Sequence, residues 1–252
     1  MKTNVIYNED CLKTLGRMSD NSVDIVITSP PYNMNLRIRK GEYTSRQIVK
    51  EFSTKYDNFD DNLPIEKYYE FHSKVLKELL RVSDLIFYNV QIVTGSKRAV
   101  FKLIGDLRDN LKDIIIWDKG HGQPSMQKQV LNKRTELLLI FEKDYPISRQ
   151  FRKRGNFDRG TLDDLWLIPR DMKRKDISHK ATFPRKLVAR ILENFSRPND
   201  IVYDPFIGIG TTAMVAHDMG RRYIGSEINK DYVDYAEKIL SKGDTFWTTK
   251  NT

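Results

Sequence analysis

Two groups of residues in the sequence have types and spacing that could do chemistry. One of them is a glycine-rich turn between two acidic residues. In "VYDPFIGIGTT", Gly208 and Gly210 follow an apolar run that ends at Asp204, and an amphipathic stretch comes next. Glycines let the backbone turn tightly and approach a ligand, and a helix that begins here offers unpaired N–H donors. Glu227 ends the next apolar run, where a carboxylate can accept both hydroxyls of a ribose. The group predicts a nucleoside site, although the turn alone also fits a plain strand-to-helix connection.

The residues of the turn narrow the class of nucleoside. The spacing is not GxGxxG, and Thr211 and Thr212 occupy the positions where a dinucleotide fold seats a pyrophosphate. This pattern argues against NAD and favours a nucleoside without a bridging phosphate. We therefore expect S-adenosyl-L-methionine as the cofactor.

A second group lies in "DIVITSPPYN", where an apolar run ends in Ser29, Pro30, Pro31 and Tyr32. We call residues 29–32 the proline corner. Proline fixes φ and has no backbone N–H, so a carbonyl at this position is held rigidly and is not bonded away. Taken alone, the proline corner is equally well explained as a rigid turn that closes a strand.

Elements that could position these groups follow from the apolar pattern. Short runs rich in Val and Ile predict buried strands at residues 23–28, 85–90, 113–117, 136–142, 200–204 and 221–227. Amphipathic stretches with a proline near their start predict helices at residues 64–82 and 183–195. This alternation predicts a single α/β domain over residues 1–252, with a doubly wound, mostly parallel sheet and helices on both faces.

Two segments interrupt the alternation of strands and helices. Residues 35–62 show no apolar period and predict a mobile loop near the active site. Residues 146–180 hold ten basic and five acidic residues and predict a small basic insertion. The whole chain has a formal net charge of +9, which favours a polyanionic partner, with nucleic acid as the leading candidate. A solvated surface is the alternative explanation for such a charged run.

Composition excludes several other classes. Cys11 is the single cysteine, so the chain has no intramolecular disulfide and no cysteine zinc cluster, and we predict no metal site. The N-terminus lacks the apolar core of a signal peptide, and no apolar run approaches the length of a membrane span. These features predict a cytoplasmic protein.

Taken together, "TSPPYN", "DPFIGIGTT" and the acidic strand end resemble the amino-methylating DNA methyltransferases, whose signature is (Asp, Asn or Ser)-Pro-Pro-(Tyr or Phe). The order of catalytic motif, basic segment and cofactor motif is the permuted order of the beta class. The blocks "NEDCLKTLGRMSDNSVDIVITSPPYN" and "HKATFPRKLVARIL" extend the resemblance over most of the chain outside the two basic regions. The resemblance implies a Rossmann-like methyltransferase fold.

The resemblance also implies roles for particular residues. The Ser29 side chain and the Pro30 carbonyl would accept the amino hydrogens of a flipped-out base, and Tyr32 would stack on that base. The implied cofactor-binding residues are Asp10, Thr182, Phe183, Asp204, Phe206, Gly208, Gly210, Thr211, Thr212 and Glu227. For Asp10 a helix N-cap is an equally good explanation, and Phe206 also fits a core residue.

Double-stranded DNA is the partner that the resemblance implies, with residues 146–180 in the place of the target-recognition region. The implied DNA-binding residues are Arg37, Arg39, Lys40, Arg149, Arg152, Lys153, Arg154, Arg159, Arg170, Lys173, Arg174 and Lys175. A serine at the head of the signature resembles the cytosine 4-amino methylating members more than the adenine 6-amino ones, which remain the alternative. An RNA or protein amide methyltransferase and a noncatalytic nucleic-acid binder are further alternatives. A second subunit and a cognate restriction endonuclease are further candidate partners.

Overall fold

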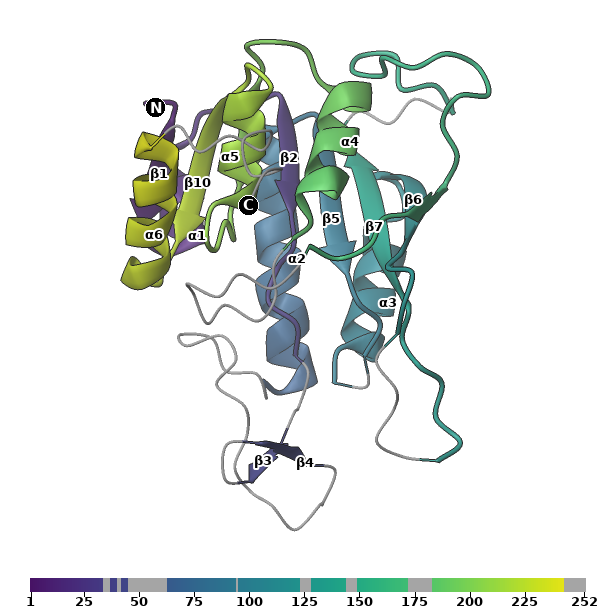
Figure 1. Cartoon of the computed structure of the whole chain (residues 1–252). Coiled ribbons are helices and arrows are strands. Elements are labelled where there is room, and N and C mark those ends of the chain that lie inside the picture. Colours follow the sequence, from purple (N-terminus) through teal and green to yellow (C-terminus); the bar gives the residue numbers. More distant parts are fainter. Residues whose placement is uncertain are drawn as a thin grey trace.

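An eight-stranded sheet forms the centre of the structure, a computed structural model that describes residues 1–33, 37–39, 42–44, 63–93, 95–122, 128–143, 149–171 and 183–242 (Figure 1). In order across the sheet, the strands are β1 (Val5–Asn8), β10 (Arg222–Glu227), β9 (Ile201–Asp204), β2 (Ile25–Thr28), β5 (Leu85–Val90), β7 (Thr135–Glu142), β6 (Leu111–Asp118) and β8 (Leu165–Leu167). A separate antiparallel hairpin pairs β3 (Arg37–Arg39) with β4 (Glu42–Thr44).

Strand direction determines what lies at each edge of the sheet. Among the strands of this sheet, β7 is antiparallel to both of its neighbours, β5 and β6, while every other neighbouring pair is parallel. The carboxyl ends of the parallel strands therefore share one edge with the amino end of β7. We call it the carboxyl edge, and the opposite one the amino edge. In open α/β sheets, ligands bind at the carboxyl edge.

Six helices cover the two faces of the sheet within the described part of the chain. Helices α1 (Cys11–Arg17), α2 (Ile65–Val82) and α3 (Lys97–Asp106) pack on one face. Helices α4 (Arg185–Phe195), α5 (Thr211–Asp218) and α6 (Lys230–Ser241) pack on the other. Successive side chains of a strand point to opposite faces, so in β2 Ile25 and Ile27 join the core under α4–α6 while Val26 joins the core under α1–α3.

The predicted α/β fold with a mostly parallel sheet is confirmed. All six predicted strands are present with ends within two residues, as are the two predicted helices. The sequence analysis did not identify β1, β8 or the short strands β3 and β4, which lie within the predicted loop of residues 35–62. Strand β8 belongs to residues 146–180, and its Trp166 is fully buried against the core that α4 covers, so part of this predicted insertion is a strand of the main sheet. Among the described residues, none of the helices has the length and apolar character required to cross a membrane.

Candidate functional site

Asp204 connects the glycine-rich turn to the strand that leads into the proline corner. Its Oδ1 accepts hydrogen bonds from the Thr28 hydroxyl at 2.7 Å and from the Phe206 N–H at 3.0 Å, and its Oδ2 accepts one from the Thr212 hydroxyl at 2.7 Å. Asp204 is 3% exposed, and burial raises its pKa from 3.8 to about 6 although these hydrogen bonds act in the opposite direction. The predicted cofactor residues Asp204 and Thr212 therefore bind each other and shape the turn.

The two glycines of the turn have a backbone conformation that other residues rarely adopt. Gly208 has φ of 54° and Gly210 has φ of 85°. A Cβ on Gly210 would lie 2.7 Å from Cβ of Ala236, so this glycine also lets α5 begin close against α6. Thr211 is the first residue of α5 and is nearly buried. The turn is thus fixed by backbone geometry at the start of the helix, where the sequence predicts the helix to begin.

Glu227 lies at the carboxyl end of β10, beside this turn. Its Oε2 accepts a hydrogen bond from the Gly208 N–H at 3.0 Å, and its Oε1 accepts one from the Asn229 N–H at 2.9 Å. Burial raises its pKa, and these backbone donors oppose the shift. Each carboxylate oxygen has a second lone pair. Glu227 can therefore accept further hydrogen bonds while it remains attached to the turn.

The buried Asp204 and the partly buried Glu227, for which the described residues supply no cationic partner, make the site suitable for a cation. Within the described residues, no lysine or arginine forms an ion pair with Asp204 or Glu227. The negative charge of Glu227 also contributes to the raised pKa of Asp204. S-adenosyl-L-methionine offers ribose hydroxyls for Glu227 and a positively charged sulfonium for this negative region, so the residues present fit that cofactor.

Asp10, Phe206 and Phe183 make defined contacts in the structure. Asp10 is the N-cap of α1, accepting a hydrogen bond from the Leu12 N–H at 2.8 Å, so the N-cap explanation of Asp10 is correct. Phe206 is partly buried and packs 6.0 Å from the ring of Phe71 on α2. Phe183 packs edge-to-face on Trp117 at 6.4 Å. Thr182 lies outside the described residues. Binding of the cofactor by these residues stays a prediction.

The proline corner follows β2 directly at the carboxyl edge. The Pro31 carbonyl accepts a hydrogen bond from the Tyr68 hydroxyl at 3.2 Å. Asn33 bonds Leu63 through both its amide nitrogen, at 2.8 Å, and its amide oxygen, at 3.0 Å. Among the described residues, no hydrogen-bond donor reaches the Pro30 carbonyl. The corner is thus tied down on both sides while this carbonyl stays available as an acceptor.

Behind the proline corner lies a buried polar group that the sequence analysis missed. We call it the Glu136 network; it consists of Tyr32, Asn89, Lys119, Glu136 and Arg170. Oε2 of Glu136 accepts from the Tyr32 hydroxyl at 2.9 Å and from Asn89 Nδ2 at 2.7 Å. Oε1 accepts from Lys119 Nζ at 3.0 Å and from an Arg170 nitrogen at 3.5 Å. Burial lowers the pKa of Lys119, which the charge of Glu136 opposes.

The position of Glu136 could not be read from the chain because it depends on strand direction. Glu136 stands in "TELLLIFE", which predicts a strand but not which end meets the proline corner. Since β7 runs antiparallel to β5, its amino end reaches the carboxyl edge, where Asn89 pairs with Leu138. The one sequence signal for a functional role of Glu136 was its position as a charged residue directly before an apolar run that predicts a buried strand. Glu136 is only 5% exposed.

The basic residues predicted to bind DNA divide between the two edges of the sheet. Arg170 follows β8 and reaches the carboxyl edge, with a half-exposed side chain. Arg149 and Arg152 line a pocket of about 520 Å³ that also contains Asp113, near the amino end of β6, and Asp164, which directly precedes β8. Arg37 and Arg39 lie in β3, and Arg159 is exposed in a turn. Lys40, Lys173, Arg174 and Lys175 lie outside the described residues.

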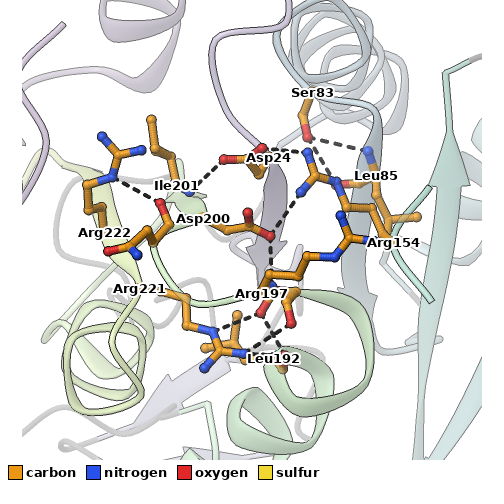
Figure 2. Close-up of polar contacts among 12 residues, drawn as sticks. Asp24, Ser83, Leu85, Arg154, Leu192, Arg197, Asp200, Ile201, Arg221 and Arg222 are labelled. Atoms are coloured by element: carbon orange, nitrogen blue, oxygen red, sulfur yellow. Dashed lines mark hydrogen bonds and ion pairs between the residues drawn. The ribbon is translucent and has the colours of Figure 1, made fainter. Parts of the chain in front are cut away.

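Arg154 and Lys153 have structural partners at the amino edge. Arg154 forms an ion pair with Asp24, directly before β2, and another at 2.9 Å with Asp200, directly before β9 (Figure 2). Lys153 lies 3.4 Å from Asp84, which directly precedes β5. Arg154 and Lys153 thus lie at the amino ends of these strands, whereas the proline corner follows the carboxyl end of β2, one strand length away. The prediction that Arg154 and Lys153 contact DNA is therefore not supported by their position, and we remove both from the candidate interface.

The arrangement brings together, at one edge, a rigid acceptor corner and a turn suited to a nucleoside. The contact between Thr28 and Asp204 joins the two motifs although they are 176 residues apart in the chain. Such a site can hold a nucleophile beside a cationic cofactor without a metal. In the described part of the chain, no cluster of three or more His, Cys, Asp or Glu side chains could bind a metal ion.

Comparison with known proteins identifies the family to which the chain belongs. A profile of the N6_N4_Mtase family, described as DNA methylase, matches residues 23–238. The Type II methyltransferase M.BglII from Bacillus subtilis is 31% identical over 271 residues, which include 94% of this chain and 69% of that protein. The Type II methyltransferase M.HinfI from Haemophilus influenzae is 28% identical over 256 residues, covering 94% of this chain and 68% of that protein.

Solved structures share the fold at lower sequence identity. The PvuII DNA methyltransferase, which is cytosine-N4-specific, superposes with a TM-score of 0.69 at 19% identity and covers 97% of this chain and 92% of its own. An M1.HpyAVI–SAM complex superposes with a TM-score of 0.60 at 21% identity, with 94% and 98% covered. From the family profile and the identity to M.BglII, the chain belongs to the DNA methylase family of N4 and N6 amino-methyltransferases, whose methyl donor is S-adenosyl-L-methionine.

Proposed function

We propose that the protein is a site-specific DNA methyltransferase that methylates the exocyclic 4-amino group of cytosine in a base flipped out of the duplex. The observation that carries this proposal is the proline corner, where a serine hydroxyl and the Pro30 carbonyl, which no donor among the described residues reaches, lie beside the glycine-rich turn. An acceptor pair of this kind suits an amino group with two hydrogens.

The chemistry explains why two acceptors are needed. The lone pair of an exocyclic amine is conjugated into the base, so the nitrogen is a weak nucleophile. Hydrogen bonds from its two hydrogens to Ser29 Oγ and the Pro30 carbonyl would favour a tetrahedral nitrogen with a free lone pair. S-adenosyl-L-methionine, when bound, supplies an electrophilic methyl group. Holding the reacting groups in line contributes up to about 7 to 11 kcal/mol in favourable systems.

The remaining residues would bind and orient the substrates. Glu227 would accept the ribose hydroxyls of the cofactor, and the ring of Tyr32 would stack on the flipped base. Tyr32 is 8% exposed, and its hydroxyl donates a hydrogen bond to Glu136. The base would therefore stack on a tyrosine ring whose orientation is fixed by this hydrogen bond. Arg170 lies at the carboxyl edge and is the first residue of 146–180 that we propose for DNA. The other proposed residues are Arg37, Arg39, Lys40, Arg149, Arg152, Arg159, Lys173, Arg174 and Lys175.

The cytosine assignment rests on Ser29 at the head of the signature. An adenine 6-amino methyltransferase of the same family is the alternative, because both bases present an amino group with two hydrogens. Incubation of the protein with duplex DNA and S-adenosyl-L-methionine, followed by nucleoside mass spectrometry, distinguishes the two. We expect N4-methylcytosine. N6-methyladenine alone would refute the cytosine assignment while leaving the amino-methyltransferase assignment intact.

The choice of polymer needs its own test. Labelled S-adenosyl-L-methionine should transfer its methyl group to duplex DNA and not to RNA or to a protein extract. Ser29→Ala should lower the rate on DNA and leave the dissociation constant of the cofactor unchanged. Transfer to RNA or protein without transfer to DNA would contradict the proposed function.

A further inference from the structure

The Glu136 network contains more hydrogen bonds than a simple ion pair between two side chains. Four donors converge on one carboxylate that is 5% exposed, and they come from the ends of four different strands. Two of the donors, Tyr32 and Asn89, also lie within hydrogen-bond distance of Ser29 Oγ, at 3.1 Å and 3.3 Å. The carboxylate is therefore one hydrogen-bonded step away from the serine that we propose as an acceptor.

The chemistry of the carboxylate determines which atom donates in each of these hydrogen bonds. An ionised carboxylate only accepts, so the Tyr32 hydroxyl has to donate its hydrogen to Glu136 Oε2. The Tyr32 oxygen is then left as an acceptor. The Ser29 hydroxyl, 3.1 Å away, has to donate its own hydrogen to this oxygen. Both lone pairs of Ser29 Oγ consequently remain for acceptance.

Asn89 supports the same orientation of the hydrogens. Its Nδ2 has two hydrogens and lies 2.7 Å from both the Tyr32 oxygen and Glu136 Oε2, which are acceptors in this arrangement. Both hydrogens are then used at these two shorter distances, so none is directed at Ser29 Oγ, which lies farther away at 3.3 Å. Asn89 thus leaves the Ser29 lone pairs unoccupied.

Lys119 and Arg170 contact the second oxygen of the same carboxylate. The Lys119 side chain is 1% exposed and pairs with Glu136 Oε1 at 3.0 Å, and Arg170 adds a second cation at 3.5 Å. The cations bind Oε1, while Tyr32 and Asn89 bind Oε2, so the two sets of contacts use different oxygens of one side chain.

We propose that Glu136 is a positioning residue for the methyl transfer, which acts through Tyr32 to turn the Ser29 hydroxyl so that its lone pairs face the target amine. Without this constraint, a serine hydroxyl can either donate or accept. A donating Ser29 would oppose the amino hydrogens instead of accepting them. The proposal rests on the proposed function and assigns Glu136 and Lys119 a role that the proline corner alone does not explain.

A matched buried ion pair provides the control. Lys112 and Glu142 pair at 2.6 Å between the same two strands, β6 and β7, with side chains 0% and 7% exposed. This pair lies at the amino edge, because Glu142 pairs with Leu85, the first residue of β5. Glu136→Gln and Glu142→Gln therefore make the same chemical change beside a buried lysine. They differ in the additional donors that contact Glu136 and, through two of these donors, in the connection to Ser29.

The experiment compares kcat and KM on duplex DNA for the full chain and its variants. We expect Glu136→Gln to lower kcat by about tenfold or more with KM for the cofactor within about threefold, and Glu142→Gln to keep kcat within about threefold of wild type. Tyr32→Phe, which keeps the ring, should lower kcat like Glu136→Gln. In the Tyr32→Phe background, Glu136→Gln should change kcat by less than about threefold, because the link is already broken.

Several results would overturn the positioning role. Equal kcat values for Glu136→Gln and Glu142→Gln would do so, as would a full, multiplicative effect of Glu136→Gln in the Tyr32→Phe background. Should Glu136→Gln fail to fold, Tyr32→Phe alone decides, since a wild-type kcat for that variant contradicts the proposal. Absence of methyl transfer by the wild-type chain would instead refute the proposed function.

Discussion

Asp204→Asn is expected to stabilise the protein at neutral pH and to weaken its binding of the cofactor. Asn has the same shape as Asp, so its oxygen can still accept hydrogen bonds from Thr28 and the Phe206 N–H. Its new amide nitrogen would face the Thr212 hydroxyl, which can turn to accept a hydrogen bond. The variant therefore removes a buried charge while preserving the contacts of the turn.

The expected magnitude follows from the pKa of Asp204. The pKa is raised from 3.8 to about 6, so the folded state binds the proton more tightly than the unfolded state. Stability from this protonation is fully present below the unfolded pKa and is lost as pH rises through the folded pKa. Wild type should therefore lose about 2 kcal/mol relative to Asp204→Asn between about pH 4 and about pH 7.5. Groups distant from Asp204 contribute equally to both proteins, whereas Glu227, whose charge interacts with Asp204, adds a smaller difference of its own.

The assay is urea unfolding of both proteins across this pH range, with cofactor binding measured by calorimetry at neutral pH. Asp109→Asn is the control for removal of a surface carboxylate, since the Asp109 side chain is 84% exposed. The cofactor should bind at least about tenfold more weakly to Asp204→Asn, because a positive sulfonium loses a nearby negative charge. Parallel pH profiles for wild type and Asp204→Asn would refute the raised pKa and with it the electrostatic argument.

Three other substitutions test the turn and the amino edge. Glu227→Gln should raise the Kd of the cofactor at least about tenfold, because an amide nitrogen would face a backbone N–H donor, and an unchanged Kd in calorimetry refutes the ribose assignment. Gly210→Ala should lower the unfolding free energy by about 2 to 4 kcal/mol through its φ of 85° and its contact with Ala236. Gly220→Ala, at φ of 73° in open space, should lower it by only about 1 kcal/mol, and equal losses in urea unfolding would exclude the contact. Arg154→Met should lower the unfolding free energy by about 1 to 3 kcal/mol, less than loss of a fully buried ion pair, because the arginine is 18% exposed. The Kd for duplex DNA should not change, and weaker DNA binding would return Arg154 to the interface.

The sequence predicts those parts of the fold that depend on local pattern. Continuous apolar runs mark the strands because strands buried on both faces need apolar side chains at most positions, as at Leu85, Ile86 and Phe87 of β5. Strand β8 escaped notice because only Trp166 of its three residues is buried, while Leu165 and Leu167 are more than half exposed. A three-residue strand with one buried side chain has no period that a pattern can detect.

Features that depend on strand direction and on spatial neighbours could not be predicted in this way. Glu136 reaches the proline corner because β7 is antiparallel, and an apolar run carries no sign of its direction. Gly225 is a second example, since a Cβ there would lie 2.4 Å from Ile207, a residue of the turn that folds back over β10. The charge count of residues 146–180 likewise gives a total without saying which arginines already have carboxylate partners.

The path of residues 149–170 explains why that charge count is misleading. The segment begins at the amino edge, where Arg154 binds Asp24 and Asp200. It then crosses the sheet along β8, which is parallel to β6, and reaches the carboxyl edge at Arg170. The early basic residues thus attach the segment to the sheet, and Arg170 arrives beside Glu136. A segment attached at one edge can present its later residues at the other with little freedom, which suits recognition of a duplex next to the proline corner.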